Sequence, residues 1–262
     1  MNPLVSIITV TFNAAEHIEL TLKSINSQTY TDYELVIVDG VSCDNTLDLI
    51  KKYSNSFTKL TIVSEVDEGI YDAMNKGIKL ASGEFIIFMN AGDTFYDRNV
   101  LNSMVNACKP GCVVFGSTMI SGLIDIPVEI VACISTLDDF FFRSPLCHQS
   151  ILFPSLAFAT LGGFDITFKV AADTEWIVRF LKKGGEFIRI ETVICTYLAD
   201  GFSSRFLYAE ANDHKRIAER HIQYKGKSKI SNTFRLRVIR VVLLLIARKL
   251  GLSVFLRKLK YG

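Results

Sequence analysis

Asn90-Ala91-Gly92-Asp93 is the stretch whose residue types and position point most directly to chemistry, because it follows the apolar run at residues 85–89. A strand that delivers a carboxylate from its carboxyl end is how an open α/β sheet presents a ligand or metal site. A carboxylate also suits Mg²⁺ when the cation must hold a substrate diphosphate. Asp93 therefore predicts an enzyme acting on a nucleotide-activated substrate. The alternative is a turn residue, since Asn, Gly and Asp are ordinary turn chemistry.

The elements that must position Asp93 follow from the pattern of the first half of the chain. Four apolar, β-branched runs predict buried strands, at residues 4–10, 35–38, 60–63 and 85–89. Three segments between them predict helices, at residues 14–28, 46–53 and 71–81. Asn45 is expected to cap the second helix and Gly83 to close the third, while Gly69 and Gly77 serve backbone geometry and close packing. This alternation predicts an α/β fold with a parallel sheet and right-handed crossovers.

Polar side chains follow three of these predicted strands. Asn13, Asp39 and Asp93 each come after a strand, at the edge where ligands of open α/β sheets bind. This convergence favours a functional role for both aspartates over an isolated turn role. The second half is less regular and predicts strands at residues 113–115, 151–153 and 187–197. It also predicts a helix at residues 174–183, which Gly184-Gly185 ends.

Composition is typical of a globular protein with a sizeable core, with 262 residues, 49% of them hydrophobic and 21% charged. No apolar run approaches the ~18 residues that a membrane-spanning helix needs. Residues 5–10 form too short an apolar stretch for a signal peptide and no basic residue precedes them, so we expect a cytoplasmic protein. The six cysteines match no zinc or redox spacing, which fits small hydrophobic side chains in that compartment.

Charge divides the chain into an acidic body and a basic tail. Residues 225–262 hold 11 of the 29 Lys and Arg and no acidic residue. The first 224 residues therefore carry 18 basic against 27 acidic residues, a net charge of −9. Residues 234–261 mix these cations with Leu, Ile, Val and Phe, which predicts a helix lying in the surface of an anionic membrane leaflet. The alternative is a helix packed on the body or in a homodimer. The apolar density and the acidic body argue against nucleic-acid binding.

Six motifs, taken in order, resemble family 2 glycosyltransferases of the GT-A fold over roughly residues 3–204. They lie at residues 5–13, 24–28, 37–46, 65–77, 161–165 and 171–176. Asn90-Ala91-Gly92-Asp93 stands where that family usually has an Asp-x-Asp element, but Asn90 and Gly92 replace acids often found there. Together with Cys147-His148-Gln149, the motifs resemble those of bacterial enzymes that build O-antigen or exopolysaccharide repeat units.

The resemblance implies a GT-A fold, a Rossmann-like and mostly parallel central sheet flanked by helices. It implies one domain at residues 1–224, with a nucleotide-binding half at about residues 1–95 and an acceptor half at about residues 96–224. The tail at residues 225–262 remains a basic, apolar helical segment for the membrane surface.

The resemblance also implies a donor site. Asp39 would accept the imide N–H of uracil, with Thr11 and Asn13 lining the same pocket, and the alternative for Asp39 is a turn residue. Asp44 is expected to start a helix.

In the motif at residues 65–77, Asp67 and Asp72 would contact the ribose or sugar and Lys76 the diphosphate. The alternative for this motif is helix capping by Asp67 and a solvated Lys76. Asp93, beside Asn90, is the implied ligand of Mn²⁺ or Mg²⁺.

Asp173 is the general base that the resemblance implies, because a sugar hydroxyl needs a carboxylate to take its proton. The alternative for Asp173 is an N-cap. Glu175 ranks second, since it lies two residues on and faces elsewhere on a helix. His148 and Gln149 are expected near the acceptor or the diphosphate, with a structural histidine as the alternative. Ser203 lies in a Gly/Ser stretch that resembles the family's loop near the diphosphate.

The function expected from this resemblance is inverting transfer of a hexose, glucose or galactose, from a UDP-sugar. The acceptor would be a sugar on a polyprenyl diphosphate, at the cytoplasmic face of the inner membrane. One alternative is a sugar nucleotidyltransferase, which would show a Gly-rich, basic phosphate loop after its first strand. Residues 11–14 do not supply one. Another alternative is a degenerate sugar-nucleotide-binding protein, motivated by Asn90 and Gly92.

Overall fold

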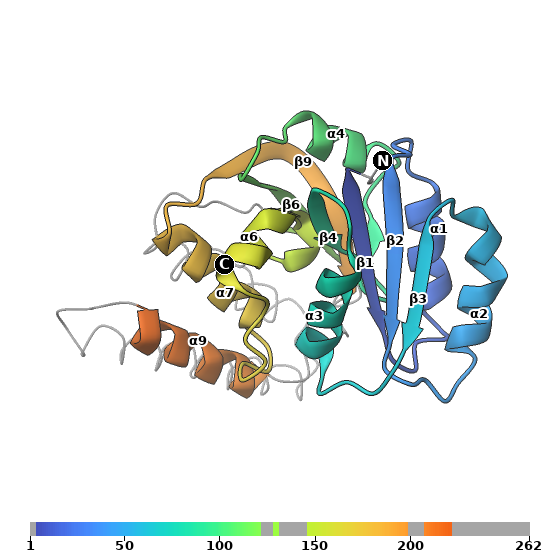
Figure 1. Ribbon diagram of the computed structural model, residues 1–262, viewed down its shortest axis with the longest axis horizontal. Coiled ribbons are helices and arrows are strands. Elements are labelled where there is room, and N and C mark those ends of the chain that lie inside the picture. The colour runs from blue at the N-terminus through green and yellow to red at the C-terminus, as the bar shows by residue number, and fades with distance from the viewer. Residues whose placement is uncertain (1–3, 122–127, 131–145, 199–206, 222–262) are drawn as a thin grey trace.

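The computed structural model describes residues 4–121, 128–130, 146–198 and 207–221, which form one central sheet flanked by helices (Figure 1). The strands run in the order β3-β2-β1-β4-β8-β6-β9-β5, and β7 pairs with β6 at the side of this path. The predicted α/β fold with helices flanking a central sheet is confirmed. The basic tail and Ser203 lie outside the described residues. Among the described helices, none is long and apolar enough to cross a membrane.

The first half of the sheet is parallel, as the alternation of strands and helices predicts. Its strands are β1 (Val5–Thr11), β2 (Tyr33–Asp39), β3 (Leu60–Ser64) and β4 (Phe85–Phe88). The connecting helices are α1 (Ile18–Asn26), α2 (Thr46–Tyr53) and α3 (Ile70–Leu80). The register places Thr11 beside Asp39 and Asp39 beside Ser64. The carboxyl ends of β1, β2 and β3 therefore lie level at one edge of the sheet.

The second half adds strands that run both ways. β8 (Ile151–Pro154) is antiparallel to β4, and β6 (Val113–Ser121) is antiparallel to β8. β9 (Phe187–Leu198) returns parallel to β6. The shorter elements are β5 (Thr94–Phe95), β7 (Val128–Ile130), α4 (Val100–Asn106), α6 (Ser155–Leu161) and the 3-10 turns η1 (Ser54–Ser56) and η2 (His148–Ser150). α7 (Ala172–Lys182) and α9 (Leu207–His221) pack against each other (Figure 1).

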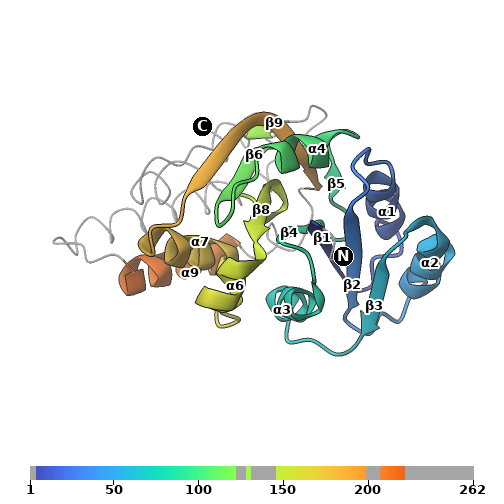
Figure 2. The same cartoon turned by 45° about the horizontal axis from the view of Figure 1, so that its top comes forward.

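Two hydrophobic cores cover the two faces of the sheet, because successive side chains of a strand point to opposite faces. Ile8, Val36 and Phe88 face α3, α7 and α9, where Trp176 is fully buried. Ile7 and Ile37 face α1, α2 and α4. Figure 2 shows α1 and α2 on one side of the parallel strands and α3 on the other. Strands of the first half of the chain and helices of the second half thus share one core around Trp176.

Two predicted helix ends differ from the structure. Asn45 occupies the N-cap position of α2 but makes no side-chain capping hydrogen bond; the carboxylate of Asp44 accepts instead from the backbone N–H of Thr46, the first residue of α2, at 3.0 Å. Gly83 does not close α3, which ends at Ala81 in an extended conformation. Gly83 is instead needed for close packing, since a Cβ there would lie 2.7 Å from the backbone nitrogen of Ser6. The predicted end of α7 at Gly184 is confirmed by its left-handed φ of +78°.

Gly77→Ala is expected to destabilise the protein, because a Cβ at this position of α3 would lie 2.5 Å from Cγ2 of Ile8. Ile8 is fully buried in the central strand β1. Overpacking of about 1–3 kcal/mol should exceed the gain of about 1 kcal/mol that alanine brings over glycine in a helix. Urea unfolding would measure the loss, with the exposed Lys79→Ala in the same helix as control. A Gly77→Ala variant more stable than wild type would contradict this packing.

Candidate active site

The turn after β4 holds Asn90 and Asp93, and both side chains are buried. The Asp93 N–H donates to the Asn90 carbonyl at 2.9 Å, and Gly92 has a left-handed φ of +103°. Thr21 of α1 secures this turn, since its hydroxyl donates to the Asp93 carbonyl at 2.8 Å and accepts from the Gly92 N–H at 2.9 Å. The stretch is therefore a tight turn, as its composition indicates, and it also directs an amide and a carboxylate into the interior.

The 3-10 turn η2 brings Gln149 to Asp93. The Gln149 amide nitrogen donates to Oδ2 of Asp93 at 2.8 Å. Its amide oxygen accepts from the thiol of Cys147 at 2.6 Å, which fixes the orientation of the amide. Desolvation and the nearby Cys195, Asp93 and Asp173 raise the pKa of Cys147 well above its ordinary value, so the thiol keeps the proton it donates. Gln149 thus holds Asp93 in place.

His148 joins the turn after β4 to the predicted base. Its Nε2 lies 3.0 Å from the amide nitrogen of Asn90, and its Nδ1 lies 3.0 Å from Oδ2 of Asp173. Because an amide nitrogen only donates, the imidazole accepts at Nε2 and donates from Nδ1 to the carboxylate. His148 is buried and bridges Asn90 and Asp173, and its contact with an acceptor or a diphosphate stays a prediction.

Asp173 lies in the first turn of α7 and is 8% exposed. The alternative of an N-cap is wrong, because α7 begins at Ala172 and Ala171 precedes it. Oδ1 of Asp173 accepts from the Thr174 N–H at 2.7 Å and lies 3.1 Å from the hydroxyl of Tyr71. The helix N-terminus also favours a negative charge at this position. The carboxylate therefore sits in a set of donors from three elements, α7, α3 and η2.

Loops after β1 and β2 are joined around Asp39. This carboxylate is fully buried and accepts from the Ser42 N–H at 3.0 Å and from the Ser64 hydroxyl at 2.6 Å. The Asn13 N–H donates to the Ser42 hydroxyl at 2.8 Å, so Asn13 and Asp39 share one partner. Val41 has a φ of +65°, which is strained for a β-branched residue. Such strain persists where the surroundings impose it and is frequent at ligand sites.

Thr11 and Asp67 also lie at this edge. The hydroxyl of Thr11 is buried and has no hydrogen-bond partner among the described residues. A Cβ atom on Gly40 would lie 2.5 Å from Oδ2 of Asp67. Asp67 therefore packs against the loop that follows Asp39. Phe12 is 61% exposed beside the same glycine. The structure therefore brings together the predicted nucleoside residues Thr11, Asn13, Asp39 and Asp67.

Lys76 pairs with two carboxylates of its own motif. Its ammonium lies 3.2 Å from Glu65 and 3.4 Å from Asp72 and donates to the Val66 carbonyl at 2.5 Å. Asp72 also accepts from the Glu68 N–H at 3.1 Å, which secures the start of α3. A solvated Lys76 is therefore wrong. The contacts of Lys76 and Asp72 stabilise the loop before α3, and contact of either residue with a diphosphate or sugar stays a prediction.

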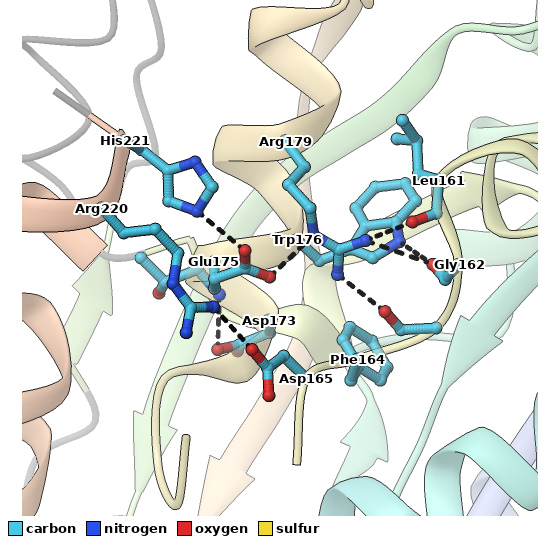
Figure 3. Close-up of polar contacts among 12 residues, drawn as sticks. Leu161, Gly162, Phe164, Asp165, Asp173, Glu175, Trp176, Arg179, Arg220 and His221 are labelled. Carbon is cyan, nitrogen blue, oxygen red and sulfur yellow. Dashed lines mark hydrogen bonds and ion pairs between the residues drawn. The ribbon is translucent and has the colours of Figure 1, made fainter. Parts of the chain in front are cut away.

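Glu175 faces away from Asp173, as its position on the helix predicts. It is 2% exposed and lies between the guanidinium of Arg179 and the imidazole of His221, at 2.8 Å from each (Figure 3). Arg179 also donates to the carbonyls of Leu161 and Gly163, so it ties α7 to the loop at residues 161–165. This cluster holds α6, α7 and α9 together and makes Glu175 a structural carboxylate.

The turn at Asn90 and Asp93 offers oxygen ligands for the implied divalent cation. Asn90 Oδ1 is a buried acceptor without a hydrogen-bond partner in the described residues, and it belongs to the same turn as the Asp93 carboxylate. Both are hard oxygen donors of the kind that Mg²⁺ and Mn²⁺ use. Among the described residues, no group of three or more His, Cys, Asp or Glu is arranged to hold a metal. The residues present thus fit a cation that the substrate diphosphate would help to hold.

Solved structures similar to this one define the class of the fold. S. aureus TarS, residues 1–349 in complex with UDP-GlcNAc, matches with a TM-score of 0.71 and 18% identity over 90% of this chain and 72% of that one. The mannosyltransferase PcManGT from Pyrobaculum calidifontis, in complex with GDP-Man and Mn²⁺, matches with a TM-score of 0.65 and 20% identity over 100% and 77%. The chain spans only 43% of a longer TarS structure. The fold is that of a GT-A glycosyltransferase.

Sequence comparison supplies the family. The model named "Glycosyl transferase family 2" matches residues 6–125. A PGL/p-HBAD biosynthesis glycosyltransferase of Mycobacterium bovis is 33% identical over 188 residues, which are 68% of this chain and 69% of the relative. An uncharacterized glycosyltransferase of Mycobacterium tuberculosis is 32% identical over 241 residues, or 88% and 90%. The chain belongs to glycosyltransferase family 2.

Some site residues were missed from the sequence. Thr21, Tyr71 and Cys147 contact Asp93, Asp173 and Gln149, respectively. Tyr71 lies inside the motif at residues 65–77, and Cys147 directly precedes His148. For Tyr71 and Cys147, the position inside a motif was the one available signal. The contacts themselves depend on how separate elements pack together.

Proposed function

We propose that the chain is an inverting glycosyltransferase that moves a hexose, glucose or galactose, from a UDP-sugar to a sugar on a polyprenyl diphosphate. The reaction would serve O-antigen or exopolysaccharide biosynthesis. One observation carries the proposal: the carboxylate of Asp173 is linked through His148 to Asn90, on the turn that also holds Asp93. A base for the acceptor and a turn for the donor diphosphate are thus held in one network.

In the proposed reaction, Asp173 takes the proton of the acceptor hydroxyl as that oxygen attacks the anomeric carbon. The bond from the anomeric carbon to UDP breaks, and its electron pair goes to the diphosphate. Attack from the face opposite UDP inverts the configuration. A divalent cation held by Asp93 and Asn90 would offset the charge that develops on the leaving diphosphate. Gln149 keeps Asp93 oriented, and His148 keeps Asp173 oriented.

The donor nucleoside is proposed to bind at the ends of β1 and β2. The unpaired hydroxyl of Thr11 supports this position, because a buried polar group without a partner is costly unless a ligand or water pairs with it. Asp39 would accept from the uracil imide, and Asp67 and Asp72 would meet the ribose or sugar. The two similar solved structures hold UDP-GlcNAc and GDP-Man, so the choice of a UDP-sugar rests on Asp39.

The acceptor side rests on residues outside the described part of the chain. Ser203 is proposed to contact the diphosphate of the UDP-sugar donor. The basic, apolar segment at residues 234–261 would hold the enzyme on the cytoplasmic face of the inner membrane, where a polyprenyl diphosphate is available. A homodimer formed through the same segment is the alternative.

A nucleotidyltransferase is disfavoured by the loop after β1. A phosphate-binding loop presents its backbone N–H groups to the ligand. Here the N–H groups of Asn13, Ala14 and Ala15 donate to the side chains of Ser42, Thr46 and Asp44. These amides are engaged within the protein and do not form a phosphate cradle.

A panel of sugar nucleotides tests the proposal. UDP-glucose, UDP-galactose, UDP-GlcNAc and GDP-mannose would be incubated with the full chain, Mg²⁺ or Mn²⁺ and synthetic lipid-diphosphate GlcNAc or GalNAc. We expect acceptor-dependent release of UDP from one UDP-hexose and little release of GDP. Calorimetry with UDP and the metal, read together with the turnover assay, distinguishes an active enzyme from a protein that only binds the sugar nucleotide. Binding of UDP without turnover across the panel would favour a degenerate sugar-nucleotide-binding protein.

A further inference from the structure

The hydroxyl of Tyr71 lies between two acceptors beside the predicted base. Tyr71 is a buried residue of α3, and its ring packs on Phe164 with 5.5 Å between ring centroids. The hydroxyl oxygen lies 2.6 Å from the carbonyl of Val170 and 3.1 Å from Oδ1 of Asp173. Tyr71 has no role in the mechanism proposed above, although its hydroxyl directly contacts the carboxylate of Asp173, the proposed base.

A phenol carries one proton, so it cannot donate fully to both acceptors at once. Desolvation, with the nearby charge of Asp173, raises the pKa of Tyr71 well above its ordinary value, so the hydroxyl keeps its proton. With the proton toward Asp173, the hydroxyl stabilises the ionised carboxylate. With the proton toward Val170, a lone pair of the hydroxyl oxygen faces Oδ1 and can accept from a protonated carboxyl group. Rotation about one C–O bond interconverts the two arrangements.

The backbone of Val170 is also held on the N-terminal side of this carbonyl. Its N–H donates to Asp213 of α9 at 2.9 Å. Asp213 is buried and pairs with Arg216 at 3.3 Å. The second acceptor for Tyr71 is therefore a fixed carbonyl and not a mobile loop atom. Around Asp173 and Tyr71, the charged or titratable groups are thus Cys147, directly before η2, His148 from η2, and Asp213 with Arg216 from α9.

We propose that Tyr71 is a positioning residue whose hydroxyl serves Asp173 in both protonation states of the transfer reaction. Before transfer it donates to the carboxylate of Asp173. When Asp173 takes the acceptor proton, the hydroxyl turns to the Val170 carbonyl and accepts from the new carboxyl group. No proton is gained or lost by Tyr71, since the proton that leaves the acceptor hydroxyl stays on Asp173. This inference rests on the proposed function, in which Asp173 is the base.

Tyr71→Phe tests the inference because it removes the hydroxyl and retains the ring that packs on Phe164. Loss of one donor to the ionised carboxylate should move the acidic limb of the pH–rate profile to higher pH. We expect kcat to fall about tenfold or more, with the KM for the donor unchanged. Tyr33→Phe is the matched control. Its hydroxyl donates to the Ile25 carbonyl at 3.3 Å. Tyr33 is the first residue of β2, so it lies at the amino ends of the parallel strands, away from the carboxyl ends that form the site.

A second readout does not depend on turnover. With ¹³C-labelled aspartate carboxyl groups, the Asp173 resonance is the one missing from Asp173→Asn, and its pH titration can be followed by NMR. We expect it to titrate at higher pH in Tyr71→Phe than in wild type and Tyr33→Phe. Coincident titrations in all three proteins would overturn the inference, even if Tyr71→Phe lowers kcat. If wild type releases no UDP from any donor, the proposed function fails, while this titration still decides whether Tyr71 serves Asp173.

Discussion

Asp173→Asn is expected to lower kcat by about 10²- to 10⁴-fold, the usual contribution of a general base. Asparagine keeps an oxygen that can accept from the Nδ1–H of His148, which lies 3.0 Å from the carboxylate in wild type. It cannot take a proton from the acceptor hydroxyl. The KM for the sugar nucleotide should change little, because the hydrogen-bond partners of Asp173 belong to η2, α3 and α7 and not to the loops after β1 and β2. Initial rates at saturating donor and acceptor measure this effect.

Asp165→Asn is the matched control for Asp173→Asn. Asp165 precedes α7 and is partly exposed, and its carboxylate pairs with Arg220 at 2.6 Å, outside the network of His148 and Asn90. Loss of this partly exposed ion pair should cost about 0–1 kcal/mol of stability and leave kcat near that of wild type. Wild-type turnover by Asp173→Asn would remove Asp173 as the base, whatever the control shows.

Asp93→Asn is expected to abolish activation by Mg²⁺ or Mn²⁺ and to lower kcat by about 10²-fold or more. Asparagine can still accept from Gln149, which donates to Oδ2 of Asp93 at 2.8 Å. The substitution therefore removes the charge and retains the hydrogen bond. With Asn90 as a neutral neighbour, no second carboxylate of this turn compensates. Rate measured against metal concentration, at fixed donor, follows the effect.

Asp97→Asn provides the comparison for Asp93→Asn. Asp97 is exposed, and its carboxylate accepts from the Asn99 N–H two residues on, at 2.7 Å. The Asp97→Asn variant should retain the metal dependence of the wild-type enzyme. If Asp93→Asn also shows an unchanged metal dependence, Asp93 does not hold the cation.

The parallel half of the fold could be predicted because local pattern determines it. Each of the four strands is a short apolar run, and each helix between them places its apolar residues on one face. The second half could be predicted only in part: the strands expected at residues 113–115, 151–153 and 187–197 lie in β6, β8 and β9, but the shorter strands were not expected. β5 has two residues and β7 three, too few to show a period. The pairing of β8 with β4, antiparallel and about 65 residues apart, depends on tertiary packing that no local pattern records.

The candidate site could likewise be predicted only in part. Strand ends placed Asp39 and Asp93 at one edge of the sheet, because the carboxyl ends of parallel strands share that edge, and motif order placed Asp173 at the start of a helix, where α7 begins. The partners of these residues were not predictable. Gln149 reaches Asp93 from 56 residues away, and Tyr71 reaches Asp173 from 102 residues away. Lys76 shows the opposite case, since its carboxylate partners lie within its own motif, although the sequence suggested only contact with a diphosphate or a solvated side chain.

The most direct test of the account is the anomeric configuration of the product. With the donor identified in the panel, an α-linked UDP-hexose and the lipid-diphosphate acceptor would be converted, and the new glycosidic bond assigned by NMR from its one-bond C–H coupling. Single displacement with Asp173 as base predicts a β-linked product, formed with stoichiometric release of UDP and only when acceptor is present. An α-linked product would contradict inversion and, with it, the role assigned to Asp173.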